Sequence, residues 1–245
     1  MQSCTDNLVY TGTDIEVVLT GNTYQAAFTE SSPVSTFNSG NQILLNASGS
    51  LQIDNRILTY MDNQWKAENE FSWSDLTGKT NVTAVYPVYP DLDYVQENLY
   101  KNNSLEDILY VKDEFPAGNS IHLQFKHLFS LLTLHLEGNL QTYFQKIEVT
   151  CPAVSSIIPK SAEIVLADNG THTTTIAQVS PSGNYSFIVP PVGNMVIAIN
   201  MVTNGKKYTT QLETKSFTGN KEYTYHLKIS EKTPGIMTEI GRASC

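Results

Sequence analysis

A chain of 245 residues has room for one large domain or two ordinary ones. Charged residues make up only 16 % of it, whereas threonine, serine, asparagine and tyrosine are abundant, and this composition favours strands and turns over helices. The net charge is −9 and Arg56 and Arg242 are the only arginines, so the chain lacks the basic face that binding to nucleic acid requires.

The N-terminal segment, residues 1–13, predicts a lipoprotein. The sequence Met-Gln-Ser-Cys over residues 1–4, followed by polar residues, is typical of the end of a bacterial lipoprotein signal, in which a small residue precedes the acylated cysteine. The apolar part of such a signal is absent, so we expect that its start is trimmed or wrongly assigned. A lipid on Cys4 would anchor an otherwise soluble domain. A flexible, unmodified N-terminus is the alternative.

Short strands separated by turns follow along the first half. Residues 14–20, DIEVVLT, predict a first strand with Ile15, Val17 and Leu19 on one face. One helical turn is expected around residues 94–100, where the chain is otherwise irregular. Further strands are expected over residues 23–28, 42–47, 56–61, 69–73, 81–88 and 107–111.

Residues 121–136, IHLQFKHLFSLLTLHL, are the most apolar run and predict two strands joined by a kink. Apolar and polar residues alternate on both flanks, and the alternation slips by one position at Leu128-Phe129. A helix is the alternative, because several of these residues also fit one helical face. We expect the chain to pass here from one β-domain to the next. Phe125, His127 and Leu128 would form the junction, with the His127 ring hydrogen-bonded to its backbone.

The second half repeats the same pattern of strands and turns. Asn204-Gly205 lies between two strand-like runs and is the strongest hairpin signal in the chain. Strands are expected over residues 146–151, 162–166, 173–179, 185–189, 195–202, 207–212 and 222–229. The spacing predicts an all-β protein of two tandem β-sandwich domains, over residues 14–127 and 128–238.

The search for chemistry predicts no enzyme, no metal site and no cofactor. No zinc-protease, serine-hydrolase, phosphate-loop or dinucleotide motif occurs, and Cys151 is expected to be a small buried hydrophobic residue. The five histidines are scattered, and His122, His135 and His226 are expected on solvated strand faces. A carboxylate pair for glycoside hydrolysis stays open, since such pairs meet only in three dimensions.

Aromatic residues concentrate in the first half, including Trp65 and Trp73. Exposed aromatic platforms bind sugars, so these two tryptophans could form an adhesive or glycan-binding face. Packing within and between sheets is the alternative, and it uses the same residue types.

Four segments occur in a fixed order along the chain: Phe71-Ser-Trp73, VTAVYP over residues 82–87, Phe125-Lys-His127 leading into LLTL over residues 131–134, and the closing GNKEYTYHL over residues 219–227. Their order resembles that in the fimbrillins of Bacteroidales, the type V pilins and their FimA- and Mfa-like relatives. The resemblance spans most of the chain, from Cys4 onward. It rests on order and spacing, because no single motif is diagnostic.

The resemblance implies a surface lipoprotein of the outer membrane with two transthyretin-like β-sandwich domains. Such subunits form pilus stalks, tips or anchors by donor-strand exchange, in which proteolysis removes an N-terminal strand and a neighbour's C-terminal segment fills the groove. Residues 14–20 would be the removable strand. The implied partners are other pilin subunits, the membrane through the lipid, and surface ligands. A non-polymerising lipoprotein that acts as adhesin, tip, anchor or glycan-binding module is the alternative function.

Two features depart from the family pattern. The best-known stalk subunits are matured by an arginine-specific protease, but no arginine precedes Arg56. We therefore expect a different protease, or a subunit that is not matured in this way. Residues 239–245, EIGRASC, read as a non-native tail, so the native chain is expected to differ beyond residue 238 and the family's donor strand to be incomplete here.

Overall fold

The computed structural model describes residues 15–19, 24–27, 37–61, 64–67, 77–116, 123–138, 144–180, 182–191, 193–203 and 206–231. In these ranges the regular structure is nearly all β, with the short helix α1 (Gln96–Leu99) and a 3-10 turn η2 (Pro90–Leu92). The all-β fold is confirmed, and α1 lies where one helical turn was expected. No helix of these residues is long and apolar enough to cross a membrane.

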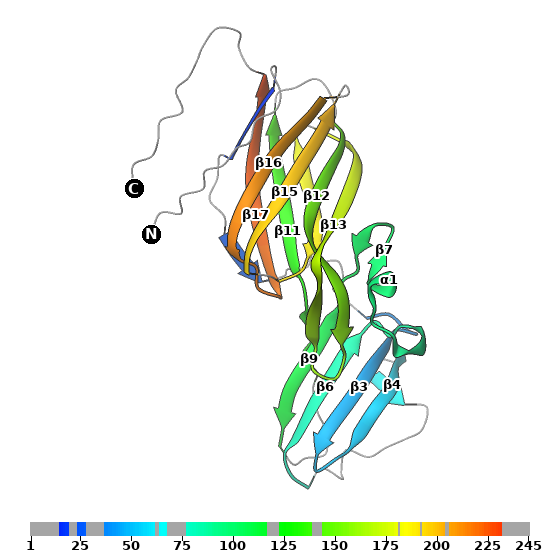
Figure 1. Cartoon of the computed structure of the whole chain (residues 1–245). Coiled ribbons are helices and arrows are strands. Elements are labelled where there is room, and N and C mark those ends of the chain that lie inside the picture. Colours follow the sequence, from blue (N-terminus) through cyan, green and yellow to red (C-terminus); the bar gives the residue numbers. More distant parts are fainter. Residues whose placement is uncertain are drawn as a thin grey trace.

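Figure 1 shows two lobes arranged end to end. One, the sandwich lobe, consists of two facing sheets. Its first sheet has the order β1-β17-β11-β14, with β2 also on β17, and its second has the order β13-β12-β15-β16. The first sheet contains β1 (Ile15–Leu19), β2 (Tyr24–Ala27), β11 (Ser130–Gly138), β14 (Gly183–Val189) and β17 (Lys221–Glu231). The second contains β12 (Phe144–Ile158), β13 (Glu163–Val179), β15 (Gly193–Thr203) and β16 (Lys206–Ser216).

The two sheets of the sandwich lobe bury one apolar core between them. Leu132, Leu134 and Leu136 of β11 alternate along their strand and meet Ile147 and Val149 of β12 in this core. The alternation in the sequence is thus the signature of a strand with one face against a partner sheet. Cys151 belongs to the same core, and burial raises the pKa of its thiol to about 12.

The other lobe, the sheet lobe, is one six-stranded sheet of order β10-β9-β6-β3-β4-β5. Its strands are β3 (Gln42–Gly49), β4 (Ile53–Met61), β5 (Gln64–Ala67), β6 (Thr80–Tyr86), β9 (Leu109–Phe115) and β10 (Lys126–His127). β3 is central and buried on both faces: Ile43 and Leu45 belong to one apolar cluster and Leu44 to another. A small pair, β7 (Tyr100–Lys101) and β8 (Ser104–Leu105), lies beside α1.

The hairpin of β12 and β13 reaches from the sandwich lobe onto the sheet lobe (Figure 1). Its end carries Val154 and Ile157 into the cluster that contains Leu44 and Val85 of the sheet lobe. The backbone amide of Ile157 also donates a hydrogen bond of 2.9 Å to the carbonyl oxygen of Tyr94. At about 3.3 Å per residue, a strand of 15 residues spans roughly 50 Å, which is long enough to take part in both cores.

One strand prediction was wrong. Residues 162–166 and 173–179 do not form two strands around a turn at Asp168-Asn169-Gly170, because β13 is continuous from Glu163 to Val179. On β12 the register advances from Pro152 to Val154 while β13 advances from Thr171 to Leu166, so the extra residues form a bulge. Asn169 takes a left-handed φ of 54°, which turn-forming residues tolerate without reversing the chain.

The kink and the hairpin were predicted correctly. β10 ends at His127 and β11 begins at Ser130, so the chain bends at Leu128-Phe129. Thr203 of β15 pairs with Lys206 of β16, so the two antiparallel strands form the hairpin that was predicted. The predicted strand over residues 69–73 lies outside the described residues. The domain boundaries stay a prediction.

Candidate functional site

The first strands of the chain pair with the last strand along one edge of the sandwich lobe. β1 runs antiparallel to β17, with Ile15 opposite Glu231 and Leu19 opposite Leu227. β2 continues along the same edge, with Tyr24 opposite Thr224. Among the described residues, β1 and β2 pair with no strand other than β17. The N-terminal strands therefore form an edge that depends on pairing with β17 alone.

The strand beneath this edge belongs to the sandwich core. Tyr223, Tyr225 and Leu227 of β17 alternate and are all buried, and Leu227 is fully buried. On its other side β17 pairs in parallel with β11. An extended segment bound along the side of β17 that β1 and β2 occupy would thus complete a sheet that covers an apolar core. We take this β17 edge as the candidate functional site.

For the predicted site residues in β1, the structure describes the pairing of the backbone with β17. Ile15, Val17 and Leu19 lie in β1, where Val17 is opposite Ile229, but the side chains of β1 lie outside the described part of the structure. Cys4 lies outside the described residues altogether.

The predicted junction residues lie where the two lobes meet. Leu128 is buried in the cluster shared by both lobes, and its backbone amide donates a hydrogen bond of 2.7 Å to the carbonyl oxygen of Ile108. Phe125 is half-buried on the other face of the sheet lobe. His127 is buried, and its Nδ1 lies 2.9 and 3.0 Å from the two carboxylate oxygens of Asp107, which is also buried.

A turn from the end of the chain closes over this junction. The amide of Asn220 donates to the carbonyl oxygen of Phe129 at 2.9 Å, and the Asn220 side-chain oxygen accepts from the amide of His127 at 3.2 Å. A Cβ on Gly219 would lie 2.5 Å from the carbonyl oxygen of Leu128, so only glycine allows this approach. The sequence analysis missed Asp107 and this turn as partners of the kink, because both contacts join residues far apart in the chain.

Trp65 lies in an aromatic cluster of the sheet lobe. Its ring centroid is 5.0 Å from those of Phe37 and Tyr60 and 6.5 Å from that of Phe125. All four residues are half-buried. These contacts favour the packing interpretation for Trp65. Trp73 lies outside the described residues.

Comparison with known proteins places this geometry in a family context. A family model described as fimbrillin-like matches residues 25–241. The fold is similar to a solved "putative cell adhesion protein" from Bacteroides uniformis ATCC 8492, with 12 % identity, a TM-score of 0.57, and coverage of 86 % of this chain and 96 % of that one.

A second solved structure of the same description, from Bacteroides ovatus ATCC 8483, shares 14 % identity with a TM-score of 0.55 and covers 80 % of this chain and 87 % of its own. At these identities the likeness concerns the fold alone. A comparison with curated proteins finds no significant match.

Proposed function

The chain belongs to the fimbrillin-like family, and from this premise we propose that it is a pilus subunit of the bacterial surface that polymerises by donor-strand exchange at the β17 edge. The observation that carries the proposal is the single ladder between β1 and β17. Loss of β1 would leave the backbone groups along one side of β17, from Leu227 to Glu231, without the partners that they have now, next to the apolar core. Such an edge is a template for strand addition.

The register between β1 and β17 indicates which positions of an incoming strand must be apolar. Residues directly opposite one another across two strands share one face of the sheet. Leu227 of β17 is fully buried, so the residue opposite it belongs to the core-facing set, together with every second residue along the new strand. Leu19 holds that position in β1. A donor segment would therefore carry apolar residues at alternate positions, as Ile15, Val17 and Leu19 do.

The lipid anchor and the removable strand are linked in this proposal. Cys4 precedes β1, so one cleavage after residue 19 would remove both the anchor and the strand. The subunit would then arrive at the outer membrane as a lipoprotein and become free for assembly once cleaved. The neighbour's segment that follows β17 would supply the new strand. The chain has no arginine before Arg56, so the cleaving protease would recognise another residue.

Removal and replacement of the first strand tests the proposal. A variant without residues 5–22 is purified in the presence and absence of a synthetic peptide of residues 13–22. We expect the variant to bind the peptide and to gain thermal stability from it, whereas the full chain, whose edge is filled, does not bind. The matched control is the same peptide carrying Val17→Asp, which places a charge against the core and should not bind.

Two outcomes would contradict the proposal. The truncated variant could remain folded and ignore the peptide, or it could remain unfolded with the peptide present throughout refolding. In either case the β17 edge does not take up a strand in place of β1. The non-polymerising surface lipoprotein, acting as adhesin, tip or anchor, would then be the better function. We assign no catalytic step to the chain.

A further inference from the structure

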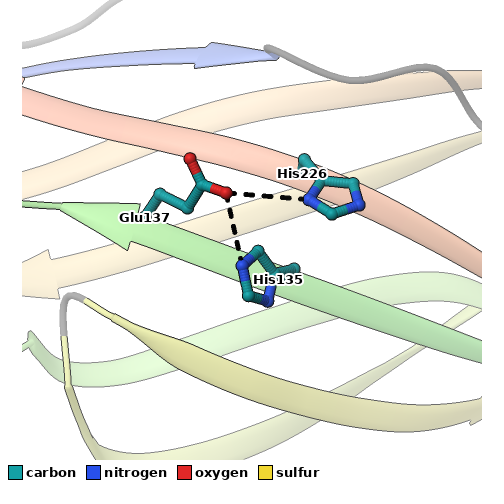
Figure 2. Close-up of side chains that lie close together, drawn as sticks. All are labelled: His135, Glu137 and His226. Carbon is teal, nitrogen blue, oxygen red and sulfur yellow. Dashed lines mark ion pairs between the residues drawn. The ribbon is translucent and has the colours of Figure 1, made fainter.

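Three side chains capable of binding a metal meet on the outer face of the first sheet of the sandwich lobe. His135 and Glu137 lie on β11, and His226 lies on β17 (Figure 2). Nε2 of His135 is 3.3 Å and Nδ1 of His226 is 3.9 Å from Oε1 of Glu137. The one ligand atom that each residue offers lies within 4.8 Å of the others.

The backbone holds these residues together. β11 and β17 are parallel, and His135 is directly opposite His226 in their register. Glu137 follows His135 by two residues and so lies on the same face of β11. The neighbours that alternate with them, Leu136 and Leu227, are buried in the core. If either strand shifted by one residue, its buried leucines would move to the exposed face of the sheet. The apolar core therefore fixes the register of β11 and β17 that brings the three polar side chains together.

A fourth residue orients one of the rings. Asn184 of β14 is opposite His135, and its side-chain oxygen accepts a hydrogen bond from Nδ1–H of that ring. In the neutral form of the ring the proton is then on Nδ1, and Nε2 has the lone pair that a metal ion can accept. It is Nε2 that faces Glu137. Histidines that bind metals are commonly oriented in this way by a hydrogen bond at the other ring nitrogen.

The spacing suits a cation better than a direct pairing of the side chains. A charge-assisted hydrogen bond between nitrogen and carboxylate oxygen is typically about 2.7–2.9 Å long, and both separations here are longer. In a tetrahedral zinc site with bonds of about 2.0–2.2 Å, ligand atoms lie about 3.3–3.6 Å apart. The His135–Glu137 separation already matches that edge, and side-chain rotation of the half-exposed His226 would bring the third atom in.

We propose that His135, Glu137 and His226 form a binding site for a divalent transition-metal ion, with Zn²⁺ as the expected ion. Two imidazole nitrogens and one carboxylate oxygen disfavour Ca²⁺ and Mg²⁺, which prefer oxygen ligands. Water or a ligand from another molecule would complete the coordination. The ion would link β17, whose edge is the candidate site for strand exchange, to its neighbour β11. The metal site is argued from its own geometry and does not depend on strand exchange.

Calorimetric titration with ZnCl₂ at pH 7.5 tests the site in the full chain. The chain carries Cys4→Ser and Cys245→Ser, so that these two thiols cannot bind zinc. We expect one equivalent to bind and the melting temperature to rise. His135→Gln and His226→Gln should each weaken binding at least tenfold, and Asn184→Ala about tenfold through the lost orientation of His135.

The matched control is His172→Gln. His172 is half-exposed on β13, outside the cluster, with Nε2 2.9 Å from the carbonyl oxygen of Asn103. We expect it to leave zinc affinity unchanged. Circular dichroism and the metal-free melting temperature of each variant show that the fold is kept. Absence of binding at 100 μM zinc in the parent chain, or unchanged binding in the His135→Gln/His226→Gln double variant, would overturn the proposal.

Discussion

The two lobes differ in how far apart along the chain their paired strands lie. In the sheet lobe, β3 pairs with β4 and β6, and β6 pairs with β9, all within one continuous stretch of sequence. In the sandwich lobe, the first strand pairs with the last, Ile15 opposite Glu231. A ladder of this kind closes nearly the whole chain into a loop, so its closure carries a higher entropic cost than pairing between strands that are close in the sequence.

This difference bears on the strand exchange that we propose. Each strand inside the sheet lobe has neighbours on both sides, except at the β5 and β10 edges. In the described part of the chain, β1 pairs along one side only, with β17, which lies more than 200 residues later in the sequence. None of the described pairings between neighbouring strands of the sandwich lobe involves β1. The six-stranded sheet thus pairs only strands that are close in the sequence, and in the proposed function the sandwich lobe is the one that loses and regains a strand. The apolar cluster with residues from both lobes is the contact that would make the two lobes unfold together.

The largest effect is expected at this shared cluster. Phe129 is fully buried between the lobes. Phe129→Ala should lower the free energy of unfolding by about 4 kcal/mol, through lost burial and the cavity left behind. Urea unfolding followed by circular dichroism measures the loss. A change below 1 kcal/mol would mean that the lobes do not depend on this contact.

Alanine substitution of one buried leucine in each lobe tests whether the two lobes unfold as one cooperative unit. Leu45 of the sheet lobe and Leu134 of the sandwich lobe are both fully buried. Each change to alanine should cost about 3 kcal/mol. Both tryptophans lie before β6 in the sequence, so fluorescence reports the N-terminal half while circular dichroism reports the whole chain. We expect both signals to shift together in both variants. Leu134→Ala with an unshifted fluorescence transition would establish independent lobes.

A smaller effect is expected where the closing turn meets the kink. Gly219→Ala places a methyl group against the backbone oxygen of Leu128, an atom that cannot rotate away. Overpacking of this kind should cost about 2 kcal/mol. Thermal unfolding measures it, with Gly78→Ala as the matched control, because a Cβ at Gly78 would meet only the Cβ of Ser50, at an ordinary contact distance of 3.6 Å. Equal destabilisation by both changes would mean that the contact with Leu128 does not set the cost.

The smallest effect is expected at an ion pair between the lobes. Lys160, at the turn of the β12–β13 hairpin, lies 2.5 Å from Asp54 of β4, and both side chains are largely exposed. Asp54→Asn should change stability by less than about 0.5 kcal/mol, because solvent and salt screen exposed pairs. Denaturation at low and high salt checks this. A larger, salt-insensitive loss would show that the contact between the lobes is more than packing.

Local patterns in the sequence predicted most strands, but not their partners. The slip at Leu128-Phe129 and the Asn204-Gly205 hairpin are properties of a few neighbouring residues, and both were predicted correctly. The continuity of β13 through Asp168-Asn169-Gly170 was missed, because turn-forming residues also form bulges when a partner strand holds the flanks.

The candidate sites depend on contacts that no local pattern contains. His135 and His226 were expected as solvated surface residues, and each is indeed half-exposed on the polar face of its strand. Their proximity follows only from the parallel register of β11 and β17. The buried pair of His127 and Asp107, and the placement of β1 against β17, likewise require the assembled sheets. The sequence thus indicates which faces are apolar, while the tertiary fold decides which polar groups meet.

The position of β17 has a mechanical consequence for a polymerised chain. In the proposed filament, β17 receives the neighbour's strand along one side and continues directly into the segment donated to the next subunit. Tension would then pass lengthwise through β17 and be resisted by its parallel ladder with β11, from Leu131 opposite Glu222 to Gly138 opposite Ile229. A ladder pulled along its strands must shear as a whole instead of unzipping bond by bond. The sheet lobe lies outside that line of force, so its surface could vary without weakening the fibre.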